Sequence, residues 1–195
     1  MKAKSLIEKF AVFGGFIAVL FEWSAILLFY FRAPIYFNGS YPLSFFSTLP
    51  ETRAIYMVCY LIAPLSFFIF VKWHLSKHYK TPVTVFFLSM ASFATLAVTT
   101  YEPSNEFNKL IHDSIARFFA ITFLSGVYLL YKKNKDSNLK KISIFIIAVT
   151  AILSFLVREL EKTPYVLMLE IVAGLLCQYW TLLISYKAYL KHKKM

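Results

Sequence analysis

The chain has 195 residues, 59% of them hydrophobic, and a formal net charge of +11. In a soluble protein this charge would indicate a nucleic-acid partner. Here the basic residues lie between long apolar segments, so we expect no nucleic-acid partner. No segment between the apolar stretches is long enough to bury a soluble core. We therefore expect a single integral membrane domain over residues 1–195.

Six apolar stretches predict six transmembrane helices. They are Phe10–Tyr30, Ala54–Val71, Val83–Thr99, Ile115–Tyr131, Ile142–Val157 and Tyr165–Tyr186. A bilayer core about 30 Å thick needs about 20 helical residues, so each stretch is long enough or nearly so. Inside hydrocarbon the backbone must satisfy its own hydrogen bonds, which a chain without alternating strands does as helices. The sequence therefore predicts an all-α, six-helix transmembrane bundle.

The basic residues predict the orientation of this bundle. Fifteen of the 21 Lys and Arg residues lie before the first stretch, after the second, between the fourth and fifth, or after the sixth. Basic residues near span ends stay in the cytoplasm, so we expect both termini to be cytoplasmic. The frequent use of Lys, Ile and Phe favours a prokaryotic plasma membrane. Membrane lipids are the expected partners, and the oligomeric state, a homo-oligomer included, is left open.

The two longer outer loops carry turn and capping signals. Residues 32–53 contain three prolines and an Asn38-Gly39 pair, so this loop is not expected to form one helix. A loop of this length is often a binding element or a lid. In the next outer loop, Ser104 is expected to cap a short helix that carries His112 and Asp113.

Ionisable residues inside the predicted spans indicate a polar pocket. Glu22 lies near the middle of the first span, where a charge costs about 2.5–3.5 kcal/mol, so such a group normally faces a partner or a cavity. Arg117 and Glu170 lie in the fourth and last spans. One interpretation is an outward-opening pocket of these three side chains, capped by His112 and Asp113. The alternative is a structural ion pair that sets the register of the helices.

Two residues at the start of the fourth span are catalytic candidates, His112 and Asp113. Asp113 and Arg117 are four residues apart, which predicts a local ion pair on one helix face. His112 points about 100° away from Asp113 and can act as an acid, a base or a headgroup donor near neutral pH. The alternative is that His112 is an ordinary packing or surface residue.

Small and polar residues predict where the helices approach one another. Gln178 in the last span is expected to form an interhelical hydrogen bond. Small residues leave room for a neighbouring helix, so Gly14-Gly15 in the first span and Ala173-Gly174 in the last would let neighbouring backbones come close.

The histidines at the inner ends do not predict a metal site. His74 and His78 are four residues apart and can share a zinc ion if a third ligand exists. Lysines surround them, and the other inner histidine, His192, is expected in a flexible tail. We therefore expect no metal and no cofactor.

The loop before the second span has a recognisable pattern. It runs Tyr41-Pro42-Leu43-Ser44, then Ser47-Thr48-Leu49-Pro50-Glu51-Thr52-Arg53-Ala54-Ile55-Tyr56. This pattern resembles the loop of the DRAM, Frag and Sfk-type six-helix membrane proteins and of an allied bacterial six-helix family. In both, a histidine commonly opens the fourth helix, and His112 matches that place. The resemblance implies lipid-linked biology, with Ser44, Ser47, Pro50, Glu51, Arg53 and His112 as the residues of the family type.

The first functional hypothesis is a lipid-binding membrane protein that is not a catalyst. Arg117, Arg53 and His112 would contact an anionic lipid headgroup. Glu22 and Glu170 would orient Arg117.

Two other hypotheses remain open. One is a membrane-embedded lipid hydrolase or acyltransferase that uses His112 with Asp113, Ser44 or Ser47. The other is a small proton-coupled transporter in which Glu22 changes its protonation state.

Overall fold

The computed structural model describes residues 10–79, 83–99, 101, 104–160 and 163–193, and it contains helices and no strand in these ranges. Six long helices make up the fold: α2 (Gly14–Arg32), α3 (Pro50–Phe70), α5 (Val83–Val98), α6 (Glu106–Lys133), α7 (Ser137–Glu159) and α8 (Val166–Lys193). Four short elements connect them: the 3₁₀ turns η1 (Pro34–Tyr36) and η2 (Leu43–Ser47), the π-helical turn η3 (Val71–Leu75) and α4 (Ser76–Tyr79). The expectation of an all-α protein is confirmed.

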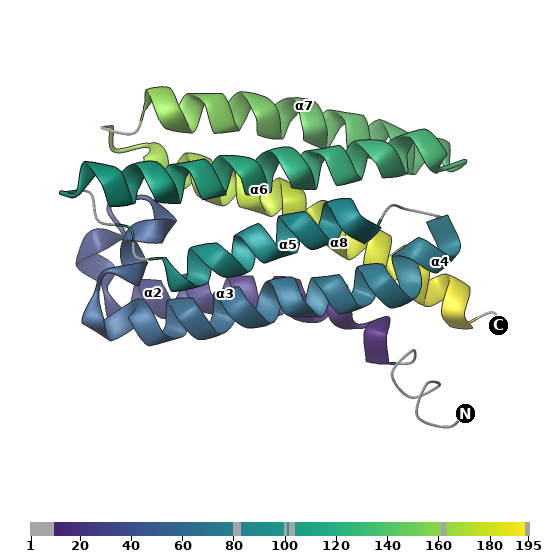
Figure 1. Ribbon diagram of the computed structural model, residues 1–195, viewed down its shortest axis with the longest axis horizontal. Helices are drawn as coiled ribbons and strands as arrows, with labels where there is room; N and C mark the ends of the chain where they lie inside the picture. Colours follow the sequence, from purple (N-terminus) through teal and green to yellow (C-terminus); the bar gives the residue numbers. More distant parts are fainter. Residues whose placement is uncertain (1–9, 80–82, 100, 102–103, 161–162, 194–195) are drawn as a thin grey trace.

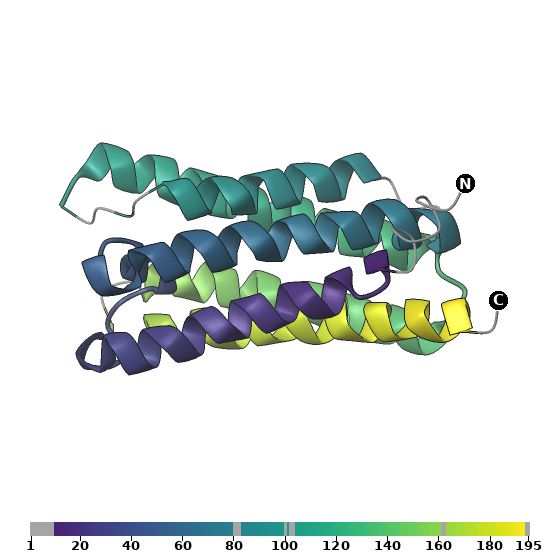
Figure 2. The same ribbon diagram turned by 90° about the horizontal axis from the view of Figure 1, so that it is seen from below.

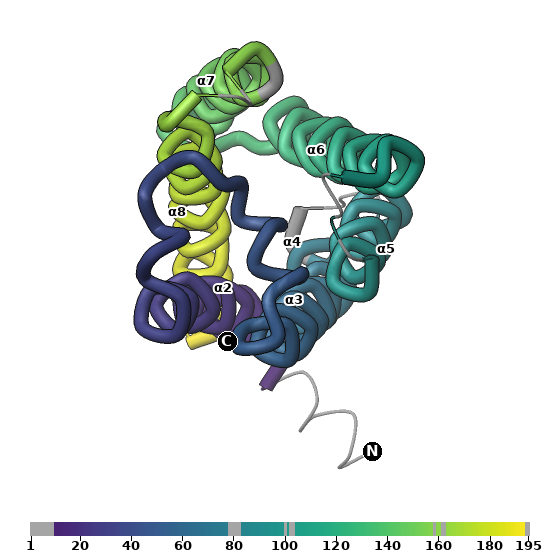
Figure 3. The backbone as a smooth tube through the Cα atoms, turned by 90° about the vertical axis from the view of Figure 1, so that its left-hand side faces the viewer, coloured from purple at the N-terminus to yellow at the C-terminus, as the bar shows by residue number. Residues whose placement is uncertain are grey.

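The six long helices form a ring in chain order (Figure 3). Each helix packs against the next one in the chain, and α8 closes the ring by packing against α2. Successive helices run in opposite directions, so α2 begins and α8 ends at the same end of the bundle (Figures 1 and 2). We call this the lysine-rich end, because ten described lysines lie near it: Lys72, Lys77, Lys132, Lys133, Lys135, Lys140, Lys141, Lys187, Lys191 and Lys193. The opposite end is the loop end, where residues 33–49 cross the ring (Figure 3).

Five of the long helices are long and apolar enough to cross a membrane, namely α2, α3 with η3, α6, α7 and α8. The chain therefore has the character of a multi-pass integral membrane protein. The remaining helix, α5, is apolar but has only 16 residues, which is about 24 Å of helix. Large apolar side chains such as Leu20, Ile121 and Phe155 are more than 60% exposed on the outside of the bundle, as expected of a surface that faces lipid.

An aromatic cluster holds the helices together toward the lysine-rich end. Phe86 and Trp180 are fully buried and stack with ring centroids 6.2 Å apart, and Phe123 packs against both. The indole Nε1 of Trp180 donates a hydrogen bond to Ser143 Oγ at 3.0 Å. This bond satisfies the one polar atom of a buried indole.

The glycines of α2 and α8 have different surroundings. A Cβ on Gly14 would lie 2.3 Å from the carbonyl oxygen of Ser66, and one on Gly15 would lie 1.9 Å from Ser185 Oγ. The predicted close approach at Gly14-Gly15 is therefore confirmed, against α3 and α8. A Cβ on Gly174 would have no neighbour within 4 Å in the described part of the chain. The prediction that Gly174 allows a close helix approach is wrong, because this residue faces open space.

Two helix boundaries differ from those predicted. The N-cap of α6 is Asn105, whose side chain accepts hydrogen bonds from the backbone N–H groups of Phe107 and Asn108, both at 3.2 Å. The prediction of a Ser104 cap and a separate short helix is wrong, since α6 is continuous from Glu106 to Lys133. Helix α8 continues to Lys193, so His192 belongs to a helix and not to a flexible tail. Polar residues extend both helices beyond the apolar stretches, and hydropathy alone does not detect such extensions.

Candidate functional site

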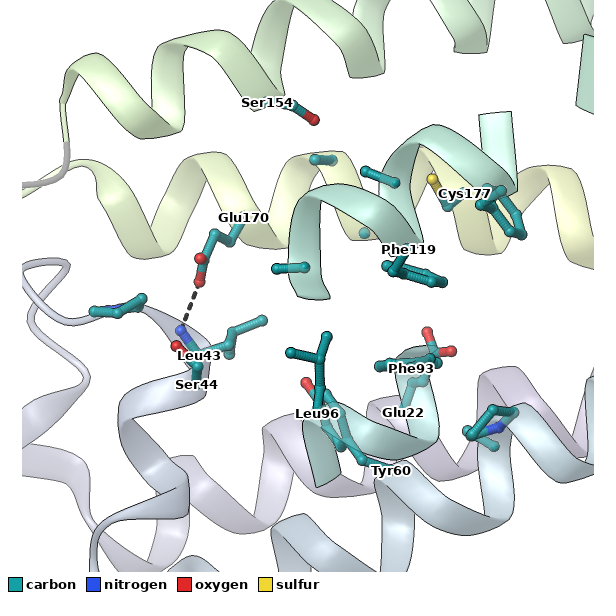
Figure 4. Close-up of a pocket in the computed structure, with 18 of the residues that line it drawn as sticks. Glu22, Leu43, Ser44, Tyr60, Phe93, Leu96, Phe119, Ser154, Glu170 and Cys177 are labelled. Carbon is teal, nitrogen blue, oxygen red and sulfur yellow. Dashed lines mark hydrogen bonds between the residues drawn. The ribbon is translucent and has the colours of Figure 1, made fainter. Parts of the chain in front are cut away.

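The ring of helices surrounds a cavity of about 590 Å³. All six long helices and the loop residues 42–44 contribute to its wall. This volume is within the range of about 300–1,000 Å³ that is usual for small-molecule sites. Figure 4 shows part of the lining, with Glu22 and Glu170 at separate positions on the wall.

The loop at the loop end is fastened to the cavity by hydrogen bonds. The backbone N–H of Leu43 donates to Glu170 Oε2 at 2.6 Å (Figure 4). The hydroxyl of Ser47 donates to the carbonyl oxygen of Ser44 at 2.7 Å and accepts from the N–H of Tyr101 at 3.2 Å. As expected, the loop does not form one helix, and its residues 42–44 line the cavity.

One face of α6 carries most of the acidic and basic residues of the cavity. Its lining residues each lie three or four positions from another: Lys109, His112, Asp113, Ala116, Arg117, Phe119, Ala120 and Phe123. This spacing places them along a single stripe of the helix. His112 is buried, and its Nδ1 has no hydrogen-bond partner among the described residues. Its ring lies edge-on to that of Tyr101, with centroids 5.3 Å apart.

Arg117 lies on the cavity wall but is not paired as predicted. It is an exposed side chain, and it forms no ion pair with any residue that the structure describes. The expected ion pair with Asp113 is therefore absent. Glu22 and Glu170 do not orient Arg117 either, since their hydrogen bonds go to other groups. Arg117 lies at the wall with its cationic group available.

The middle of the cavity contains a hydrogen-bonded pair of polar side chains. Gln178 Nε2 of α8 donates to Glu22 Oε2 of α2 at 2.5 Å. The predicted interhelical hydrogen bond of Gln178 is thus confirmed, and its partner is a residue that was itself singled out. Gln178 is eight positions after Glu170 on α8, which corresponds to about 12 Å along the helix axis. The two carboxylates therefore lie at different depths.

Four of the five candidate ligand-binding residues line this one cavity: Glu22, His112, Arg117 and Glu170. The fifth, Arg53, is exposed in α3 and is not part of the cavity wall. Of the catalytic candidates, Asp113 lines the cavity together with His112. The serine candidates differ, because Ser44 lines the cavity, whereas Ser47 is hydrogen-bonded to Ser44 and to the backbone of Tyr101.

The aromatic part of the wall was not identified from the sequence. Tyr56, Tyr60 and Phe67 line the cavity from α3, together with Pro64, at intervals of three or four residues. Across the cavity, Phe119 of α6 contributes to the same wall. The helical spacing of the α3 residues is the signal that could have identified this stripe.

The lysine-rich end contains two histidines in contact. The ring of His74 lies 5.5 Å from that of His192, centroid to centroid, in a perpendicular arrangement. The side chain of His78 lies outside the described residues. Over the described ranges, no three His, Cys, Asp or Glu side chains are grouped so that they could hold a metal ion.

An ion pair connects two helices at the same end. Asp136 is the N-cap of α7, and its carboxylate accepts from the N–H groups of Asn138 and Leu139, both at 3.0 Å. It also pairs with Lys187 of α8. The hydrogen bond from Lys187, followed by those from the backbone, lowers the pKa of the Asp136 carboxyl below its usual value. Asp136 therefore stays ionised at neutral pH.

No protein-family model, curated protein or solved structure matches this chain. The resemblance to the DRAM, Frag and Sfk-type proteins therefore stays a prediction that depends on the loop pattern and on His112.

Proposed function

We propose that this chain binds a membrane lipid in the cavity at the centre of the helix ring. The observation that carries the proposal is the composition of the cavity wall. Toward the loop end the wall holds ionisable side chains such as Lys109, His112 and Arg117, and the rest is largely aliphatic and aromatic. A molecule with a polar headgroup and an apolar chain satisfies both parts of such a wall.

Arg117 and His112 supply the contacts to the headgroup in this proposal. Arg117 has no ionic partner among the described residues, and its guanidinium group can bind a phosphate with two hydrogen bonds. The buried Nδ1 of His112 has no hydrogen-bond partner in the described part of the chain, so a headgroup oxygen or hydroxyl would satisfy it. Arg53 is not included, because it lies off the cavity wall.

We further propose that α5 also crosses the membrane and that both termini face the cytoplasm. Helix α5 is short, but it packs between α3 and α6 within the ring. A short span is accommodated at modest cost by local thinning of the bilayer. The lysines near one end of the bundle favour the cytoplasmic side for that end. The loop end of the cavity would then face the outer leaflet of a plasma membrane.

The proposal is tested by native mass spectrometry of protein purified in mild detergent. The wild type should carry a lipid adduct of defined mass. Gly174→Phe should lose it, because this position faces open space in the cavity wall and a ring there fills the cavity. Arg117→Ala should also release the lipid, since its headgroup contact is lost. Val172→Phe is the matched control, because Val172 is 38% exposed on the same helix and is not part of the wall. The same adduct on all four proteins would contradict the proposal.

A lipid hydrolase or acyltransferase is a second candidate, supported by one observation. Ser44 and His112 line the same cavity, as a nucleophile and a base must. Turnover of a lipid by the wild type that is lost in both Ser44→Ala and His112→Ala would favour this candidate. Binding of a lipid without turnover would favour the non-catalytic one.

A further inference from the structure

The polar pair in the middle of the cavity has more hydrogen-bond acceptors than donors. A carboxylate has no donor and can accept about four hydrogen bonds. Glu22 accepts one within the described residues, from Gln178 Nε2. Because Gln178 turns its NH₂ group toward the carboxylate, its Oε1 is left buried and has no hydrogen-bond partner among the described residues. Gln178 itself is only 6% exposed.

When Glu22 is ionised, no side chain that the structure describes balances its charge. Glu22 forms no ion pair with any residue in the described ranges. An ionisable group inside a membrane helix normally has an opposite charge as its partner or faces a water-filled cavity. Both Glu22 and Gln178 line the cavity. The missing donor and the missing positive charge can therefore be supplied by one ligand that enters from the cavity.

Aromatic rings in the wall of the same cavity favour a cation. Phe93 and Phe119 stack with centroids 4.8 Å apart, and Tyr60 lies edge-on to Phe93 at 5.1 Å. All three rings belong to the wall of the same cavity. Aromatic faces attract cations through their quadrupoles, most strongly where water is excluded.

We propose that Glu22 and Gln178 form a second binding site in the cavity, which takes a monovalent cationic group: the primary ammonium of an apolar amine, or an alkali metal ion. The cation pairs with the Glu22 carboxylate and is also coordinated by Gln178 Oε1. Along α8 the site lies about 12 Å from Glu170, whose carboxylate accepts a hydrogen bond from the loop at the loop end. Its existence does not depend on lipid binding there.

Equilibrium dialysis of the purified protein in detergent tests this site. The probes are radiolabelled phenethylammonium and sodium-22, and 2-phenylethanol serves as an uncharged competitor of similar shape. Saturable binding of phenethylammonium that excess 2-phenylethanol does not displace supports an organic ammonium as ligand. Saturable binding of sodium-22, displaced by potassium, supports an alkali ion. Absence of both kinds of binding to the wild type overturns the proposal.

Variants locate the bound cation. Glu22→Gln keeps the size of the side chain and removes its charge, so it should weaken binding at least tenfold. Gln178→Leu removes the second acceptor and should weaken binding to a smaller extent. Glu159→Gln is the matched control, because Glu159 is an exposed carboxylate at the end of α7 and lies off the cavity wall. Equal binding by the wild type and Glu22→Gln would overturn the site. Lipid adducts are measured separately, so the two proposals can fail independently.

Discussion

Replacing Gly126 or Gly174 with alanine should change stability in opposite directions. Both glycines lie inside long helices, Gly126 in α6 and Gly174 in α8. A Cβ on Gly126 would lie 2.6–2.9 Å from three ring atoms of Phe86. That ring is fully buried and is held between Phe67 and Trp180, so it cannot move aside freely. A Cβ on Gly174 would have no described neighbour within 4 Å.

The magnitudes follow from two opposing contributions. Alanine in a helix interior is more stable than glycine by about 0.5–1 kcal/mol. Overpacking a closely packed core costs about 1–3 kcal/mol. Gly174→Ala receives only the first contribution, so its free energy of unfolding should rise by about 0.5–1 kcal/mol. Gly126→Ala receives both, so its free energy of unfolding should fall by up to about 2.5 kcal/mol.

The assay is unfolding in mixed micelles of mild detergent and dodecyl sulfate, followed by circular dichroism. The same chemical change is made on both helices, so each variant is the control for the other. A Gly126→Ala variant at least as stable as the wild type would refute the close contact with Phe86. Equal shifts in both variants would refute the open space at Gly174 as well.

Two further substitutions test buried and capping contacts. Ser143→Ala leaves the buried Nε1–H of Trp180 without an acceptor. The free energy of unfolding should therefore fall by about 1–3 kcal/mol. Ser125→Ala, on an exposed face of α6, is the control and should change it little. Asp136→Ala loses the N-cap of α7 and the ion pair with Lys187, so its free energy of unfolding should fall by about 0.5–2 kcal/mol. Asp136→Asn should keep much of the cap and lose only the ion pair. Because the pKa of folded Asp136 is lowered, its contribution is complete above the unfolded pKa of about 3.9 and is lost as the pH falls through the lowered value. The free energy of unfolding should therefore fall more steeply at acid pH in the wild type than in Asp136→Asn. Identical pH profiles of the two proteins would contradict this.

The helices could be predicted well from the sequence because the bilayer leaves few alternatives. Each of the six apolar stretches corresponds to a helix of the structure. The residues at which the helices begin and end were less predictable. Helix α6 begins at Glu106, nine residues before the apolar stretch at Ile115, because the side chain of Asn105 caps a polar extension. Hydropathy reports where the chain meets lipid, and capping decides where the helix begins.

The cavity residues were partly predictable for an energetic reason. A carboxylate in the middle of a span is costly unless it has a partner or a cavity, and this singled out Glu22. Its actual partner, Gln178, could not be distinguished from Arg117, because the rotation of each helix about its axis depends on packing that one sequence does not reveal. The surroundings of Gly174 could not be predicted for the same reason, since a glycine that allows close packing and one that faces a cavity look alike in a sequence.

The most direct test of the central claim is photolabelling with a phospholipid that carries a diazirine on its acyl chain. Phe119 and Ile171 line the cavity, whereas their neighbours Phe118 and Val172 are exposed on the outside. Bulk lipid should label the outer pair in any case. If a lipid enters the cavity, peptide mass spectrometry should find the label on Phe119 and Ile171 as well, and Gly174→Phe should remove only this inner label. Labels confined to Phe118 and Val172 in the wild type would contradict lipid binding in the cavity.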